Sequence, residues 1–441
     1  MSSLLLKLIF CIFLHKITNS EEITFKNVTI NGKPGTMFAT ADNLKKIIPV
    51  GEEIVEVSGK IPLLYEKSVS DIPNLRYLLL AAVSLEEIKP GAFENLPSLH
   101  SLSLRENNLT EIKSDTFNNL NVTSINLKKN SITTLQPGAF KNLHLDSLVL
   151  DFNKLTKFPS GVFENVTIDT LSLISNHLST LEPNSLPTTT LRYLDLSKNR
   201  FEEIDPEIFD MPQLIGLTLS FNSLKFLRLG DLKNLPGLIF LELDNNQLER
   251  IPEGVFNNTE IRFLRLHHNK ITKIASQAFD GMSNLTTLSI NHNNLTFWDN
   301  NWLRGTPQLS KIEADFNQIA EIPDEAFKNY PVLGSIDLKG NKIKKISRKA
   351  FHKLKSVDSL NFSNNEISNW SPDLLTNVTV NRTLNLSMNK LKCMDGDLGE
   401  VFKNVGFVNF QSNPWDDDCI EKIANFVLLK LLMIKLGINY E

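Results

Sequence analysis

Three histidines near two aspartates are the residues in this sequence whose types and spacing could carry chemistry. His267 and His268 stand directly before Asn269, and His292 lies between Asp244 and Asp315 along the chain. Imidazole and carboxylate groups can bind a metal ion, act as a catalytic acid and base, or change charge near pH 6.5. The alternative is that the histidines are exposed side chains beside a structural asparagine. A repeated stretch would favour that structural interpretation.

The stretch around the histidines is one copy of a repeat. The frame L-x-x-L-x-L-x-x-N-x-L recurs at steps of 23 or 24 residues, beginning at Leu75, Leu99, Val122, Leu145, Ile168, Leu191, Leu214, Leu238, Ile261, Leu285, Leu309, Leu333, Val357, Asn381 and Val405. Asn269 fills the asparagine position of one copy, and the same position is held by Asn107, Asn130, Asn153, Asn176, Asn199, Asn222, Asn246, Asn293, Asn317, Asn341, Asn365, Asn389 and Asn413. The repeat therefore predicts a structural role for Asn269.

The frame predicts a solenoid in which each coil is covered by the next. The first, fourth, sixth and eleventh positions are apolar and are expected to point inward. The asparagine amide can donate to and accept from backbone groups of neighbouring coils, so Val83 is expected to end this ladder. A second column is expected to stack as a buried spine: Phe93, Phe117, Phe140, Phe163, Phe209, Phe256, Phe279, Phe327 and Phe351, with Leu186, Leu232, Leu303 and Leu375 as substitutes.

These columns resemble extracellular leucine-rich repeat proteins of the 24-residue type, over roughly residues 52–420. The resemblance implies an α/β fold: a curved leucine-rich repeat solenoid with a parallel β-sheet on the concave face, and loops and short helical turns on the convex face. The layout is similar to secreted arthropod members, including the leucine-rich immune proteins of mosquitoes. It differs from that subgroup because no coiled-coil heptads follow the repeats.

Both ends of such a stack need a cap. Residues 1–20 are predicted to be a secretory signal peptide, with a signal anchor as the alternative. Residues 21–74 are predicted to form an N-terminal cap, with a hairpin at its Asn-Gly pair, and a degenerate first coil. Repeats are expected over residues 75–404, and the last coil and C-terminal cap over residues 405–441. The apolar C-terminal stretch is short and interrupted by lysines, which suits a capping helix better than a membrane span.

Removal of the signal peptide would leave two cysteines, Cys393 and Cys419. A pair near one end suits a disulfide in an oxidising compartment better than a metal cage, which needs more ligands. The sequons agree with a secreted glycoprotein and lie at Asn27, Asn108, Asn121, Asn165, Asn257, Asn284, Asn294, Asn361, Asn369, Asn377, Asn381 and Asn385. Asn361 and Asn385 hold concave positions, so glycans there would shield that end of the sheet.

The third, fifth and seventh positions of each copy, flanked by the second and eighth, are expected on the concave face. In the central copies they combine large rings with charges, as protein interfaces with aromatic anchors do. The residues predicted to bind a ligand there are Tyr193, Phe240, Glu242, Asp244, Phe263, Arg265, His267, His268, His292 and Phe316.

The sequence contains no G-x-S-x-G, H-E-x-x-H, P-loop or paired-cysteine metal motif, so neither an enzyme nor a cofactor is predicted. The net charge of −4 gives no reason to expect a nucleic-acid partner. We predict a secreted, extracellular protein that recognises a protein or glycan ligand, with innate immunity as one context and no transmembrane span. An extracellular matrix or cell-adhesion component is the alternative, followed by a receptor ectodomain. The sequence leaves the oligomeric state open.

For the histidines, solvated side chains remain the simplest interpretation. His268 and His292 share the eighth position on successive coils, so their backbones should lie about 4.8 Å apart. His267 shares the seventh-position column with Asp244. A pH-dependent ligand affinity is the first alternative, because histidine charge changes near pH 6.5. A zinc ion held by His268, His292 and a carboxylate is a weaker variant, since an open sheet lacks supporting groups.

Overall fold

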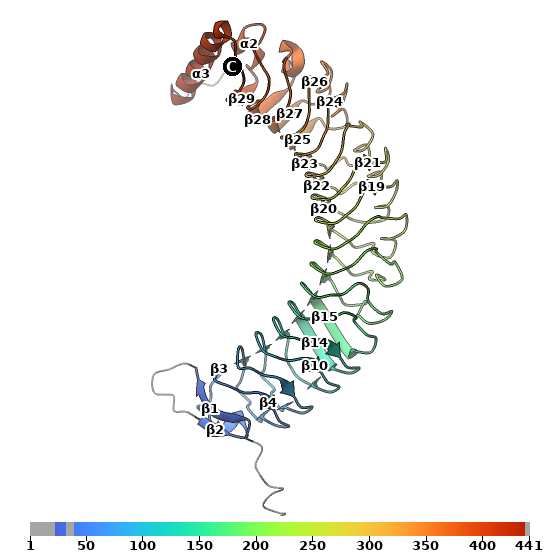
Figure 1. Cartoon of the computed structure of the whole chain (residues 1–441), viewed down its shortest axis with the longest axis vertical. Coiled ribbons are helices and arrows are strands. Elements are labelled where there is room, and N and C mark those ends of the chain that lie inside the picture. Colours follow the sequence, from blue (N-terminus) through green and yellow to red (C-terminus); the bar gives the residue numbers. More distant parts are fainter. Residues whose placement is uncertain (1–22, 32–38, 437–441) are drawn as a thin grey trace, which may run out of the picture. The chain divides into compact units, whose positions relative to one another are not determined.

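The computed structural model describes residues 23–31 and 39–436. The predicted signal peptide lies outside these residues. The chain forms two compact units, one ending at Leu191 and the other beginning at Arg192. Each unit is a stack of coils, and each coil contributes a strand to a parallel sheet (Figure 1). The predicted parallel-sheet solenoid is confirmed.

In the first unit, the parallel sheet has the order β3-β6-β9-β12-β14-β15. Its strands are β3 (Ile54–Ser58), β6 (Tyr77–Leu79), β9 (Ser101–Ser103), β12 (Ser124–Asn126), β14 (Phe140–Val149) and β15 (Phe163–Ser172). Between them lie the short strands β4 (Leu63–Leu64), β5 (Val69–Ser70), β7 (Glu87–Ile88), β8 (Phe93–Glu94), β10 (Glu111–Ile112), β11 (Phe117–Asn118) and β13 (Thr134–Leu135). These pair from coil to coil in parallel ladders of their own.

In the second unit, parallel pairing runs in chain order through the main-sheet strands. They are β16 (Tyr193–Asp195), β17 (Gly216–Thr218), β18 (Phe240–Glu242), β20 (Phe263–Arg265), β22 (Thr287–Ser289), β23 (Lys311–Glu313), β25 (Val332–Asp337), β27 (Ser356–Asn361), β28 (Thr379–Asn385) and β29 (Val405–Asn409). The shorter ladders pair β19 (Arg250–Ile251) with β21 (Lys273–Ile274), and β24 (Glu321–Ile322) with β26 (Lys345–Ile346).

Helices are few in the part of the chain that the structure describes. They are the 3-10 helices η1 (Leu44–Lys46) and η2 (Pro372–Leu375), and the α-helices α2 (Leu398–Val401) and α3 (Asp417–Leu436). Most segments that return from one main strand to the next are turns and two-residue strands. Among the described residues, no helix is both long and apolar enough to cross a membrane.

Asn269 shows how neighbouring coils are joined. Its amide nitrogen donates to the carbonyl oxygens of Leu243 and Leu266, each at 3.0 Å, and its amide oxygen accepts from the Leu248 N–H at 3.0 Å. The side chains of this column from Asn107 to Asn389 are buried, so these bonds satisfy backbone groups that water cannot reach. The structural role predicted for Asn269 is confirmed.

The ladder ends at Val83, as predicted. Val83 has no side-chain amide, and the N–H of Ile61 on the preceding coil donates to the backbone carbonyl of Val83 at 2.7 Å. On the following coil, the side-chain oxygen of Asn107 accepts from the N–H groups of Val83 and Leu85, both at 3.0 Å. A backbone carbonyl therefore replaces the missing asparagine.

The predicted phenylalanine spine is present in both units. In the first unit, ring centroids of Phe93, Phe117, Phe140 and Phe163 follow one another at 6.0, 5.2 and 5.5 Å. In the second unit, Phe256 and Phe279 lie 5.8 Å apart, and Phe327 and Phe351 lie 5.5 Å apart. Phe163 departs from the expected burial, because it is half-buried while its stacking partner Phe140 is fully buried.

At the N-terminal end, β1 (Phe25–Ile30) pairs antiparallel with both β2 (Ala39–Ala41) and β3. Phe25 and Val28 are fully buried. Two apolar side chains of β1 therefore lie in the core of the first unit. The connection between β1 and β2, where the hairpin turn is predicted, lies outside the described residues.

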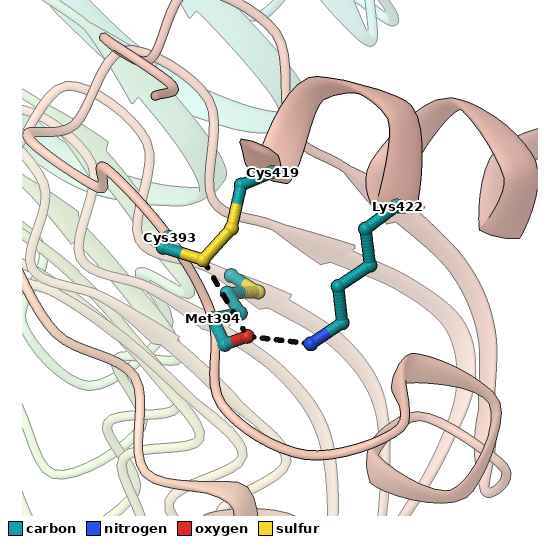
Figure 2. The surroundings of a disulfide bond; sticks show 4 residues. All are labelled: Cys393, Met394, Cys419 and Lys422. Atoms are coloured by element: carbon teal, nitrogen blue, oxygen red, sulfur yellow. Dashed lines mark hydrogen bonds between the residues drawn. A yellow bond between two sulfur atoms is a disulfide. The ribbon is translucent and has the colours of Figure 1, made fainter. Parts of the chain in front are cut away.

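At the C-terminal end, a disulfide joins Cys393 and Cys419, whose Cα atoms lie 5.4 Å apart (Figure 2). Beside it, Lys422 Nζ of α3 donates to the carbonyl oxygen of Met394 at 2.8 Å. The ring of Phe426, also on α3, lies 5.8 Å from the ring of Phe402. A covalent bond, a hydrogen bond and apolar packing thus hold α3 against the last coils.

Loss of the disulfide is expected to loosen this cap. In a Cys393→Ser/Cys419→Ser variant, the unfolded chain is no longer cross-linked and gains conformational entropy. This should lower the free energy of unfolding by about 3 kcal/mol. Hydrogen exchange read by mass spectrometry should show faster exchange in α3 and β29, with the first unit unchanged. Non-reducing peptide mapping of the wild type supplies the control. Recovery of both cysteines as free thiols would contradict the bond.

Candidate ligand-binding face

The main sheet of the second unit presents one set of side chains away from the core. Side chains alternate along a strand, so in β20 Leu264 points inward and is fully buried, whereas Phe263 and Arg265 on either side are exposed. The same alternation holds in β18 and β23. We call the surface formed by the outward residues of β16 to β28 the sheet face.

A row of aromatic side chains crosses the sheet face at the third position of the repeat. The rings of Phe240 and Phe263 stack in parallel, with centroids 4.9 Å apart and planes 4° apart, and the two residues are 41% and 40% exposed. A Cβ atom at Gly216 would lie 2.9 Å from Cδ1 of Tyr193, so the ring of Tyr193 covers this glycine. We call Tyr193, Phe240 and Phe263 the first aromatic row. It exposes large apolar side chains that burial by a partner would stabilise.

Charged groups lie beside the first aromatic row. The Arg265 guanidinium donates to the Glu242 carboxylate at 2.6 Å. Burial raises the pKa of Glu242, and Arg265 opposes that shift. Asp244 is 5% exposed, and its carboxylate accepts from Ser220 Oγ at 2.6 Å and from Asn245 Nδ2 at 2.7 Å. Asp244 therefore helps to hold the face together and offers little surface to a ligand.

His267 is the least accessible of the three histidines. Its Nε2 lies 3.7 Å from the carboxylate of Asp244, and its Nδ1 is buried with no hydrogen-bond partner among the described residues. Burial lowers the pKa of His267, although Asp244 acts in the opposite direction. Protonation of His267 is therefore less favourable than that of a solvated histidine.

The other two histidines belong to a second aromatic row at the eighth position. The ring of His292 stacks on His268 with centroids 4.1 Å apart and on Phe316 with centroids 4.5 Å apart. All three residues have a left-handed backbone with φ of 52°. Gly340 follows in this column, and a Cβ atom there would lie 2.7 Å from Cδ1 of Phe316, so the glycine makes room for that ring. We call His268, His292 and Phe316 the second aromatic row.

The structure gives no support to a zinc ion held by His268, His292 and a carboxylate. The rings of His268 and His292 lie nearly parallel, with planes 11° apart. Within residues 23–31 and 39–436, no three histidine, cysteine, aspartate or glutamate side chains form a group that could hold a metal ion. The two rings, at the same position of successive coils, are in stacking contact.

An open hollow of about 750 Å³ lies on the sheet face next to the two rows. Its lining is polar and reaches from Arg265 and His267 through Glu313, Asp315 and Asp337 to Asn385. Burial and the nearby charge of Asp337 raise the pKa of Asp315 to about 6. The hollow is therefore a partly desolvated, acidic part of the same face.

Two predicted glycosylation sites line this hollow. Asn361 Nδ2 donates to the Asp337 carboxylate at 3.2 Å, while its side-chain oxygen accepts from Ser363 Oγ at 2.8 Å. The side-chain oxygen of Asn385 likewise accepts from Ser387 Oγ at 2.7 Å. Both asparagines are half-buried. Asn284 and Asn294 are also half-buried, and the remaining sequon asparagines are exposed. Occupancy of these sequons remains a prediction.

His267 and His292 are expected to make the second unit less stable as the pH is lowered below 6.5, while Asp315, with its pKa raised to about 6, acts in the opposite direction. Burial lowers the pKa of His267 and His292, and the other histidines add to the shift of His292. The unfolded chain then binds protons that the folded chain does not, so acid favours unfolding. Urea unfolding between pH 5 and 7.5 should show a steeper acid loss for the wild type than for a His267→Gln/His268→Gln/His292→Gln variant. If stability depended on pH equally in the two proteins, the histidines would not be the cause of the acid destabilisation.

Known protein families match the repeat observed in the structure. Residues 86–215 and 247–379 match the family described as the BspA type leucine rich repeat region, in 6 copies, and residues 189–248 match a leucine rich repeat family. The first match covers more than half of the chain. The chain belongs to the BspA-type leucine-rich repeat family. The resemblance predicted from the sequence is confirmed at the level of the leucine-rich repeat.

Individual relatives are more distant from this leucine-rich repeat chain. Chaoptin of Tribolium castaneum is 37% identical over 73 residues, which are 17% of this chain and 9% of chaoptin. A structure of the Drosophila Toll–Spatzle complex superposes with a TM-score of 0.63 at 22% identity, covering 76% of this chain and 47% of the matched chain. A leucine-rich repeat protein of Leptospira interrogans gives 0.59 at 24% identity, covering 82% and 95%. At these identities the structural likeness shows the fold alone.

Proposed function

We propose that this leucine-rich repeat chain is a secreted, extracellular recognition protein that binds a protein ligand through the sheet face of its second unit. The observation that carries the proposal is the first aromatic row, whose stacked Phe240 and Phe263 are about two-fifths exposed. Exposed aromatic side chains beside a charged pair are typical of the residues that dominate binding energy in protein interfaces.

The second aromatic row supports the same proposal. Left-handed backbone disfavours bulky side chains by roughly 1–2 kcal/mol per residue, and glycine or asparagine would avoid that cost. His268, His292 and Phe316 nevertheless occupy such positions and stack in the open. The same left-handed backbone occurs at this position in copies that carry Phe152, Phe221 or Met388, so it belongs to the repeat. The stacking of the rings is what supports the proposal. A glycan remains a second class of ligand, and a role in innate immunity rests on the resemblance of the repeat pattern.

The experiment that tests the proposal is capture of the ligand from native extracellular fluid. The chain is cross-linked to its partners in that fluid, purified, and the partners are identified by mass spectrometry. We expect a soluble protein, and we expect the secreted chain to begin near Glu21. A chain that stays in the insoluble fraction until high salt is added would favour the matrix alternative. A chain found only inside cells would contradict secretion.

A further inference from the structure

We propose that the hollow of the sheet face receives a lysine or arginine side chain of the protein ligand, held by Asp315 and Asp337, while an apolar residue of the same segment packs on Phe263. This inference rests on the proposed function, because it names the chemistry of a partner bound at the same face. It is carried by the charge pattern of the hollow and by its position beside the first aromatic row.

The two lysine and arginine side chains that line the hollow already have anionic partners. Arg265 pairs with Glu242 at 2.6 Å, and Lys311 forms a short ion pair with Glu313. Asp315 and Asp337 both line the hollow, and neither forms an ion pair with any side chain that the structure describes. The hollow thus holds two carboxylates without a matching positive charge.

The charge of Lys339 favours the ionised form of Asp315, but Lys339 forms no ion pair with it among the described residues. Lys339 Nζ lies over the ring of Phe316, 5.5 Å from its centroid. The Asp337 carboxylate accepts from the Lys339 backbone N–H at 2.9 Å and from Asn361 Nδ2 at 3.2 Å, which orients it without neutralising it. Burial and the charge of Asp337 make ionisation of Asp315 unfavourable. A cation from the ligand would relieve this repulsion.

The spacing between the hollow and the first aromatic row limits the segment. From Phe263 on β20 to Asp315, which follows β23, there are two strand steps of about 4.8 Å and four residues of about 3.3 Å along the strand. The diagonal is about 16 Å, which an extended peptide spans in about five residues. The expected segment therefore carries a basic residue about five positions from an aromatic or large aliphatic residue.

The inference can be tested with a phage-displayed library of random 16-residue peptides. Peptides are selected on the secreted wild-type chain, and their binding is then measured on an Asp315→Asn/Asp337→Asn variant. We expect the selected peptides to share a lysine or arginine and an apolar residue, and to bind the variant at least tenfold more weakly. Asp373→Asn, at an exposed residue of η2, is the control and should bind like the wild type.

The outcomes separate this inference from the proposed function. Peptides that lose binding on Phe240→Ala/Phe263→Ala but not on Asp315→Asn/Asp337→Asn would overturn the inference and leave the proposed function standing. Peptides unaffected by either variant, or no selected peptides at all, would overturn both. A glycan on Asn361 would occupy the hollow, so glycopeptide mapping that finds this site filled would also overturn the inference.

Discussion

Asn269→Ala is expected to lower the free energy of unfolding of the second unit by about 2–4 kcal/mol. The substitution removes three buried hydrogen bonds and leaves the Leu248 N–H without its partner. The carbonyl oxygens of Leu243 and Leu266 each keep one side-chain bond, from Asn246 and Asn293. Each unsatisfied buried group costs about 1–3 kcal/mol, partly relieved by a water or a small backbone shift. Because coils stabilise their neighbours, the loss should spread to adjacent coils. Urea denaturation followed by circular dichroism measures it.

Lys270→Ala is the matched control for Asn269→Ala. Lys270 is the next residue along the chain, and it is exposed. An exposed substitution of this kind usually changes stability by less than about 0.5 kcal/mol. If both variants unfold at the wild-type urea concentration, the asparagine column does not join the coils in the way described. The prediction is independent of any ligand.

The second large effect is expected on binding. Once the extracellular partner is identified, Phe240→Ala/Phe263→Ala should weaken its binding by at least about 2 kcal/mol, or about 30-fold. The two rings are stacked and exposed, so their truncation removes the apolar contact surface while leaving the inward residues of β18 and β20 in place. Surface plasmon resonance measures the affinity, and circular dichroism confirms that the variant is folded.

Phe407→Ala provides the control for that variant. Phe407 lies in the same column on β29, is 45% exposed, and pairs in register with Thr383 of β28. It is separated from the first aromatic row by several coils, so its removal should leave the affinity unchanged. If both variants lost the same affinity, the loss would reflect fewer apolar side chains on the surface in general and not a specific site. No loss for Phe240→Ala/Phe263→Ala would remove the first aromatic row from the binding site.

The repeating part of the fold was predictable from the sequence because each column has one physical task. Asn269 and its equivalents satisfy backbone groups at a fixed place in every coil, and the phenylalanine spine fills one layer. Phe240 and Phe263 could be placed side by side for the same reason, since equal phase on neighbouring coils means adjacency in a parallel sheet. The exception in the ladder at Val83 followed from the missing amide.

The remaining features depend on side-chain packing that the frame does not fix. Gly216 and Gly340 fill ordinary outward positions in the sequence, and only the structure shows that the rings of Tyr193 and Phe316 lie over them. The left-handed backbone of the eighth position could have been predicted from the sequence. Asn245 and Gly340 share that position with His268, and asparagine and glycine favour this conformation. The direction of the histidine pKa shifts required burial as well as neighbouring charges, and burial was not available from spacing.

The hollow was not predicted from the sequence. Asp337 lies outside the central copies in which ligand contacts were predicted, yet it lines the hollow together with Asp315. The repeat places Asp315 and Asp337 on successive coils, but the burial that raises the pKa of Asp315 could not be read from the repeat. The interaction of the two charges arises because β23 and β25 are adjacent in the sheet.

The most direct test of the central claim is site-specific photo-cross-linking from the sheet face. A benzophenone amino acid is placed at Phe263 in one protein and at Phe407 in another, and each is irradiated in the native extracellular fluid. We expect a cross-linked protein partner from position 263 and none from position 407. Cross-links from position 407 alone, or from neither position while the partner is still captured by the chain, would contradict binding at this face.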